Sequence, residues 1–128
     1  MQNNFQKESI EMVTLYYRNH SKASKRAIEW FRKNNIEINR VNINEISEKS
    51  IFQLIYLSDM EIPQILRQDP LSYFLHYKKK KAKELRFSES LTYLEKNSNL
   101  LQDPIILSPN FSQIGYDEAR LIKYSKKL

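Results

Sequence analysis

The chain has 128 residues, which is enough for one domain with a hydrophobic core. Hydrophobic residues make up 41% and charged residues 28% of the sequence, a composition typical of a globular protein. The formal net charge is +6, and residues 78–86 alone hold six basic side chains against one acidic side chain. A single basic patch therefore dominates the charge of the chain, and it either faces solvent or meets phosphates or an acidic protein surface.

Three scarce residue types exclude many kinds of site. The sequence has no cysteine, so disulfides, cysteine metal sites and thiol mechanisms are excluded. Its single glycine excludes the glycine-rich loops that bind nucleotide phosphates, and its two histidines are too few for a three-histidine metal site. We therefore expect no metal and no cofactor. No apolar run is long enough to span a membrane, and the first residues show no secretory pattern, so we expect a cytoplasmic protein.

The first third of the chain predicts a strand, a helix and a second strand. Residues 12–17 are apolar, β-branched or aromatic, which indicates a buried strand. Ser21 is a suitable N-cap, and apolar residues recur at helical spacing from 23 to 31. Residues 36–43 alternate apolar and polar side chains, which indicates a second strand. These elements predict a βαβ unit with parallel strands.

The middle of the chain, residues 47–99, shows no strand pattern and is predicted to be helical. Ser47 and Ser88 are predicted to cap two of its helices. Asp69 and Pro70 together resemble an N-cap followed by a proline in the first helical position.

The last third predicts a return to sheet. Residues 104–107 and 111–115 indicate two strands joined by a short turn, and Asp117 is predicted to cap a closing helix. This order of elements predicts an α/β, thioredoxin-like fold with a four-stranded mixed sheet and an inserted helical domain. The expected organisation is a polar N-terminal extension (1–11), a thioredoxin-like core (12–46 and 100–128) and an inserted helical subdomain (47–99).

Four short motifs, in order, resemble the Spx and arsenate-reductase-like (ArsC) family over residues 12–124. They are Val13-Thr14-Leu15-Tyr16, Lys25-Arg26-Ala27-Ile28-Glu29-Trp30, Leu100-Leu101-x-x-Pro104-Ile105-Ile106 and Gly115-Tyr116-Asp117-Glu118. The resemblance implies a thioredoxin-like core with a helical insertion. It also implies a cis peptide bond before Pro104, placed against the first loop.

The sequence departs from this family where the chemistry takes place. Redox-active members carry Cys-x-x-Cys at the start of the first helix, and this chain has Ser21 and Ser24 there. A serine hydroxyl stays protonated and cannot form a disulfide. The family arginine before the proline is also missing, because Gln102 and Asp103 precede Pro104. We therefore expect no arsenate reduction, no thiol switch, no catalytic residue and no small-molecule substrate.

The resemblance to Spx regulators implies a non-catalytic transcriptional regulator. Its implied partner is the C-terminal domain of the RNA polymerase α-subunit, or another acidic protein. Glu61, beside Met60, stands where Spx regulators have a contact glycine. An indirect contact with promoter DNA stays open. The candidate partner-binding residues are Tyr17, Met60, Glu61, Lys78, Lys79, Lys80 and Lys81.

Several alternatives stay open from the sequence. Ser21 and Ser24 could bind an anion at the helix N-terminus, or they could simply cap a helix in a decayed active site. His20 beside Ser21 invites a nucleophile–base pair, although no orienting acid is evident in the sequence. The chain could also be a degenerate arsenate-reductase-like protein that serves as a protein-binding module outside transcription, or an oxidoreductase-like fold with no retained activity. An enzyme with relocated chemistry is the least supported alternative.

Overall fold

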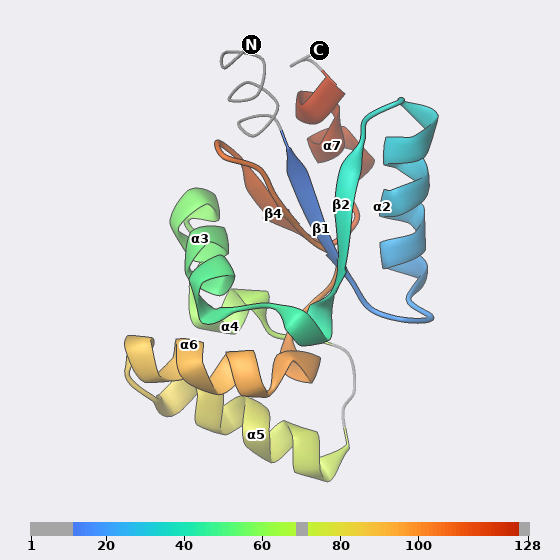
Figure 1. Ribbon diagram of the computed structural model, residues 1–128. Coiled ribbons are helices and arrows are strands. Elements are labelled where there is room, and N and C mark those ends of the chain that lie inside the picture. Colours follow the sequence, from blue (N-terminus) through green and yellow to red (C-terminus); the bar gives the residue numbers. More distant parts are fainter. Residues whose placement is uncertain (1–11, 69–71, 126–128) are drawn as a thin grey trace.

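The computed structural model describes residues 12–68 and 72–125. It contains one four-stranded sheet with the strand order β2-β1-β3-β4 (Figure 1). β1 pairs with β2 in parallel and with β3 antiparallel, and β3 pairs antiparallel with β4, so the predicted mixed sheet is confirmed. The strands are β1 (Val13–Tyr17), β2 (Ile38–Asn42), β3 (Ile105–Leu107) and β4 (Ser112–Ile114).

Helices cover both faces of the sheet. Neighbouring residues of a strand point to opposite faces, so β1 contributes side chains to the core on each side. Leu15 of β1 is buried on the face covered by α2 (Lys22–Lys33) and α7 (Glu118–Ser125). The next residue, Tyr16, is buried on the opposite face, against the helices between β2 and β3. The predicted strand–helix–strand unit is therefore present, with α2 crossing between the parallel strands β1 and β2.

Local sequence explains where α2 begins and ends. The Ser21 hydroxyl accepts a hydrogen bond from the backbone N–H of Ser24 at 3.1 Å, which is the predicted N-cap. The helix ends at Asn34, and Asn35 has a left-handed backbone with φ of 57°. Trp30 and Phe31 are buried on the sheet side, with their rings 5.1 Å apart.

Four helices and two short 3-10 turns separate β2 from β3. They share a core with one face of the sheet, and α5 and α6 lie side by side at the end farthest from the termini (Figure 1). The segments are η1 (Ile43–Glu45), α3 (Glu48–Ser58), α4 (Ile62–Ile65), α5 (Tyr73–Glu84), α6 (Phe87–Lys96) and η2 (Ser98–Leu100).

The predicted helix starts in this segment have different outcomes. Ser47 caps α3 by accepting from the N–H of Ser50 at 3.1 Å, as predicted. The prediction that Ser88 caps a helix is wrong, because α6 begins at Phe87. The N–H of Arg86, the residue before the helix, donates to the Glu89 carboxylate. The expected cap at residues 69–70 lies outside the described residues, and the described N-cap of α5 is Ser72.

The last strands form the predicted hairpin and lead into α7. Ser108 closes the turn, with its N–H donating to the carbonyl of Phe111 at 2.8 Å. Gly115 follows β4 with φ of 86°, a conformation that other residues rarely adopt. Asp117 accepts a hydrogen bond from the N–H of Ala119 at 3.1 Å, so its predicted capping role is confirmed. In the described part of the chain, no helix has the length and apolar character needed to span a bilayer.

Candidate functional site

The candidate site is built where β1 leads into α2 and where the chain enters β3. Between β1 and α2 the chain turns sharply, with a left-handed backbone at His20 (φ of 65°). Ser21 is half-buried and Ser24 is fully buried. The Asp103–Pro104 peptide bond is cis, and it lies beside this turn because the Asp103 side chain bonds to Ser24. The topology therefore brings the serine pair and the residues before Pro104 together.

The carboxylate of Asp103 is held by donors from the first loop and helix. The Ser24 hydroxyl donates to its Oδ2 at 2.5 Å, and the Arg18 Nε donates to its Oδ1 at 3.1 Å. A hydrogen bond of this length between a hydroxyl and a carboxylate is among the strong ones. The Asp103 side chain is only 13% exposed and that of Arg18 only 21%, so the ion pair is shielded from solvent.

Arg18 is fixed by more than this ion pair. Its guanidinium also donates to the carbonyl of Leu101, and its backbone N–H donates to the Ser24 hydroxyl at 3.1 Å. The Ser24 oxygen therefore accepts from one residue and donates to another, so both of its functions are used. Arg18, Ser24 and Asp103 form a closed network, which we call the Asp103 network.

The Asp103 network contains a cation that the sequence analysis did not identify. No arginine stands directly before Pro104 in the sequence. Instead, Arg18 supplies a guanidinium from the end of β1, and Asp103 neutralises it. The sequence analysis missed Arg18, although its position directly after a buried strand, at the mouth of the first loop, was a usable signal.

His20 does not complete a catalytic pair with Ser21. Its side chain is exposed, and within residues 12–68 and 72–125 it has no hydrogen-bond partner. Asp103, which lines the same depression as His20, is bonded to Arg18 and Ser24 rather than orienting an imidazole. The nucleophile–base interpretation is therefore unsupported by the geometry.

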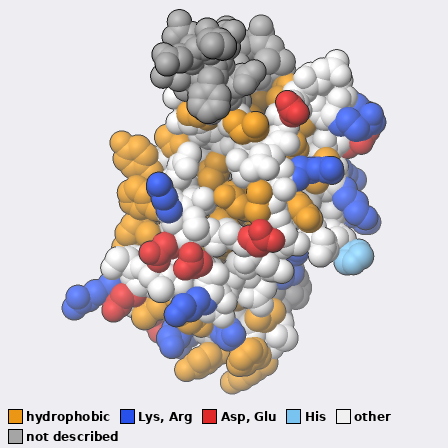
Figure 2. Space-filling view, viewed as in Figure 1, with side chains coloured by type: hydrophobic (Ala, Val, Ile, Leu, Met, Phe, Trp, Pro, Cys, Tyr) orange, Lys and Arg blue, Asp and Glu red, His pale blue; other side chains and the backbone are white. Residues whose placement is uncertain are grey.

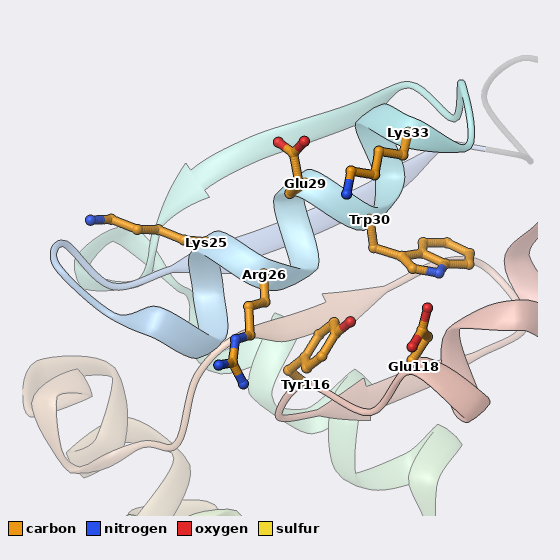
Figure 3. Close-up of a pocket in the computed structure, with 7 residues that line it drawn as sticks. All are labelled: Lys25, Arg26, Glu29, Trp30, Lys33, Tyr116 and Glu118. Atoms are coloured by element: carbon orange, nitrogen blue, oxygen red, sulfur yellow. The ribbon is translucent and has the colours of Figure 1, made fainter.

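A shallow depression of about 500 Å³ opens beside this network. It carries two arginines, of which Arg18 is paired with Asp103 and Arg67 donates to the carbonyl of Asn99 at 3.3 Å. A larger depression of about 560 Å³ lies elsewhere, where α2 meets the segment leading into α7 (Figure 3). The residues that line the first depression are Arg18, Asn19, His20, Ser21, Arg67, Gln68, Gln102 and Asp103.

The residues singled out as a partner surface do not form one patch. Tyr17 is half-buried against the core on the α2 and α7 face of the sheet, whereas Met60 packs against the core on the opposite face. Glu61 is exposed at the start of α4, and its N–H donates to the side-chain oxygen of Gln64 at 2.8 Å. The structure therefore places Tyr17 apart from Met60 and Glu61.

The lysine run on α5, residues 78–81, contains two lysines that hydrogen-bond to other elements and two exposed lysines. The Lys78 ammonium donates to the Asn97 side chain at 3.0 Å, and Lys79 donates to the carbonyl of Arg67. Lys80 and Lys81 are exposed. The Lys81 ammonium lies 5.4 Å from the centroid of the Tyr93 ring on α6. Three of the four lysines therefore contact groups outside α5, and Lys80 alone has no such contact among the described residues. Among the described residues, no cluster of three His, Cys, Asp or Glu side chains could hold a metal ion.

Comparison with known proteins identifies the fold. No protein-family model matches the sequence, and no curated protein matches it. A Bacteroides fragilis protein described as ArsC-family-related has a TM-score of 0.76 and 18% identity, over 88% of this chain and 96% of that one. An arsenate reductase from Vibrio cholerae has a TM-score of 0.74 and 11% identity, over 88% and 97%. The chain has an arsenate-reductase-like, thioredoxin-like fold.

This similarity confirms the predicted fold class. A Staphylococcus aureus protein adds a third structure with a TM-score of 0.73 and 17% identity, over 88% of this chain and 97% of that one. At these identities the similarity concerns the fold alone, so the activity has to be inferred from the site. The site in this chain has Ser21 and Ser24 at the start of α2 and a carboxylate, Asp103, before Pro104.

Proposed function

We propose that this chain is a non-catalytic binding protein built on an arsenate-reductase-like fold. The observation that carries the proposal is the Asp103 network, in which a carboxylate of the protein takes the Ser24 hydroxyl and the Arg18 guanidinium as donors. An incoming oxyanion would meet this negative charge before it reached either donor. The nucleophilic thiolate that arsenate reduction requires is absent as well, because the chain has no cysteine.

We further propose that the chain contacts RNA polymerase through the C-terminal domain of the α-subunit. The resemblance to Spx regulators supports this partner, and the exposed turn between α3 and α4 offers the corresponding surface. That turn is held in one shape by Asp59, which has a left-handed backbone, and by the Gln64 side chain, which accepts from the N–H of Glu61. Glu61 then presents a carboxylate where the family has glycine, so the contact would need a complementary cation on the partner.

A second candidate function is a protein-binding module outside transcription. It is favoured by three exposed aromatic rings that contact one another on α3 and α6. The Phe52 and Tyr56 rings are stacked with centroids 6.0 Å apart, and the Phe52 and Phe87 rings meet edge-on at 6.2 Å. Their exposed fractions are 47%, 74% and 46%, respectively, and hydrophobic side chains gather over α3 on this face (Figure 2). Aromatic groups of this kind often carry the binding energy of protein interfaces.

Titration of the labelled chain with RNA polymerase holoenzyme and with the isolated α C-terminal domain separates the two functions. The proposal expects binding to both at roughly 10 µM or tighter, about 7 kcal/mol. Glu61→Gly should change that affinity at least several-fold, whereas the matched variant Glu48→Gly, also exposed at a helix start, should not. Absence of binding to either partner would reject the polymerase contact and leave the protein-binding module, which Phe52→Ala with Tyr56→Ala should weaken.

A further inference from the structure

The outer face of α5 exposes three aromatic rings that the core does not use. The exposed fractions are 92% for Tyr73, 63% for Phe74 and 65% for Tyr77. The helix is instead anchored by Ala82, which is fully buried, and by the half-buried Leu75. Residues four apart are neighbours on a helix surface, so Tyr73 and Tyr77 lie one turn apart on the same face. The rings are therefore available to a ligand.

Exposed cations continue the helix beyond these rings. One of them, Lys81, also lies 5.4 Å from the centroid of the Tyr93 ring on α6. Lys80 and Lys81 follow Tyr77 by three and four residues, so they lie one turn further along the helix. Both are exposed, as is Lys83, and none of the three has a carboxylate within salt-bridge distance among the described residues. The one carboxylate on α5, Glu84, stands at the last residue of the helix. In Figure 2, hydrophobic side chains and Lys and Arg side chains gather together at the α5 end of the molecule.

We propose that this face of α5 binds single-stranded nucleic acid. Unpaired bases stack on Tyr73 and Tyr77, and the phosphates lie along Lys80 and Lys81. Aromatic rings beside a row of cations are the two components of single-strand binding, since every base has a face that stacks and every nucleotide carries a negative charge. The proposal goes beyond the polymerase contact and does not depend on it.

Two other occupants fit the same face less well. A DNA or RNA duplex keeps its bases stacked on each other, so it would meet the lysines but leave the rings without stacking partners. An acidic protein segment would likewise pair with the lysines without using the flat faces of Tyr73 and Tyr77. The exposure of both rings therefore favours unpaired bases.

Fluorescence anisotropy with a labelled oligothymidylate of about 12 nucleotides, at low salt, tests the proposal. The double variant Tyr73→Ala with Tyr77→Ala should lower the affinity at least tenfold and leave the salt dependence nearly unchanged. Lys80→Gln with Lys81→Gln should lower the affinity and also flatten the plot of log K against log salt by about 1.4, since each phosphate contact on a single strand contributes about 0.7. All four side chains are exposed, so circular dichroism and Tm should match those of the unmodified chain.

Matched variants control for loss of rings and charges in general. Tyr56→Ala removes an exposed ring from α3, and Lys22→Gln with Lys25→Gln removes two exposed cations from α2. Both should bind the oligonucleotide as the unmodified chain does. The proposal is overturned if the unmodified chain does not bind, if it binds a duplex as tightly, or if the control variants lose as much affinity. It is also overturned if polyglutamate binds to this face and the oligonucleotide does not.

Discussion

Asp103 behaves as an internal anion. In a site that resembles an oxyanion site, the negative charge comes from the chain itself and is bound by Ser24 and Arg18. Both partners are largely shielded from water, so the pair is screened less than a surface ion pair. Removing one partner of such a pair leaves an uncompensated charge, which is more costly than losing the attraction alone.

Replacing Asp103 by alanine should therefore open an anion site. Asp103→Ala leaves the Arg18 guanidinium unpaired, which should lower the free energy of unfolding by about 1–3 kcal/mol. Sulfate or phosphate at tens of millimolar should recover part of that loss by binding between Arg18 and Ser24. Thermal unfolding in sulfate and in chloride of equal ionic strength measures the effect.

The double variant Arg18→Ala with Asp103→Ala is the control, because it lacks the cation that would hold the anion. It should gain no more from sulfate than the unmodified chain does. An equal gain in both variants would mean that sulfate acts as a general stabilising salt, and the interpretation of Asp103 as an internal anion would fail.

Tyr124 carries a buried hydroxyl that has no hydrogen-bond partner among the described residues. Burial raises the pKa of this phenol well above its usual value, so it stays protonated. Removing a buried polar group that makes no hydrogen bond relieves its desolvation cost. Tyr124→Phe should therefore leave the free energy of unfolding unchanged or raise it by about 1 kcal/mol.

Tyr16 provides the matched comparison for this prediction. Its hydroxyl is also in the core region but lies 3.0 Å from the Ser50 hydroxyl, with which it shares a hydrogen bond. Tyr16→Phe should lower the free energy of unfolding by about 1 kcal/mol, because the hydrogen bond with Ser50 is lost and Ser50 keeps only its bond with the Ser47 hydroxyl. In urea denaturation, Tyr16→Phe should be less stable than the unmodified chain, and Tyr124→Phe should be as stable or more stable; equal losses would show that the Tyr124 hydroxyl is bonded.

The sequence predicted individual residues well only where their partners are close along the chain. Ser21 was predicted to cap α2 because the cap bond joins residues three apart. The ion pair of Arg18 with Asp103 joins residues 85 apart, and no local pattern indicates which distant side chain will meet another. The resemblance indicated that the loop and the proline meet, but it did not indicate which cation would be there.

At the scale of elements, the lysines of α5 differ in their contacts with the rest of the fold. Lys78 and Lys79 donate hydrogen bonds to groups outside α5. Among the described residues Lys80 and Lys81 donate none, although the Lys81 ammonium lies 5.4 Å from the centroid of the Tyr93 ring on α6. Lys78→Gln with Lys79→Gln should lower the free energy of unfolding by about 1–2 kcal/mol, since two charge-assisted hydrogen bonds are lost. Lys80→Gln with Lys81→Gln removes the same charge and should stay within about 0.5 kcal/mol. Chemical denaturation measures both, and equal effects would contradict this division.

The order of the elements was predictable, whereas some of their boundaries were not. Apolar periodicity indicated α2, β1 and the helical segment, because each buries one face in a core. The start of α6 was mistaken because Ser88 has the residue type of a cap, while the actual start uses the Glu89 carboxylate to accept from the N–H of Arg86. Residue preference alone cannot decide between two starts one or two residues apart.

At the scale of the molecule, the Asp103 network and the aromatic surfaces lie on different elements. The network lies at the end of β1 and the start of α2, whereas the exposed rings belong to α3, α5 and α6. The helices between β2 and β3 share their core with one face of the sheet rather than forming a core of their own. A ligand bound to α5 would therefore contact a helix that is joined to the sheet through this shared core.

The whole molecule should be indifferent to thiol oxidants, because no residue can form a disulfide. Diamide should leave the mass, the Tm and the partner affinity of the unmodified chain unchanged. The double variant Ser21→Cys with Ser24→Cys should respond, because the two residues lie three apart at the start of α2, where the Ser24 backbone nitrogen is 3.1 Å from the Ser21 side-chain oxygen. Diamide should form a dithiothreitol-sensitive disulfide in this variant, and Ser21→Cys alone should form none within the chain. Mass spectrometry after alkylation distinguishes these cases. If the double variant stayed reduced, the serine pair would not have the geometry of a redox site, and a dithiothreitol-sensitive change in the unmodified chain would contradict the expected indifference.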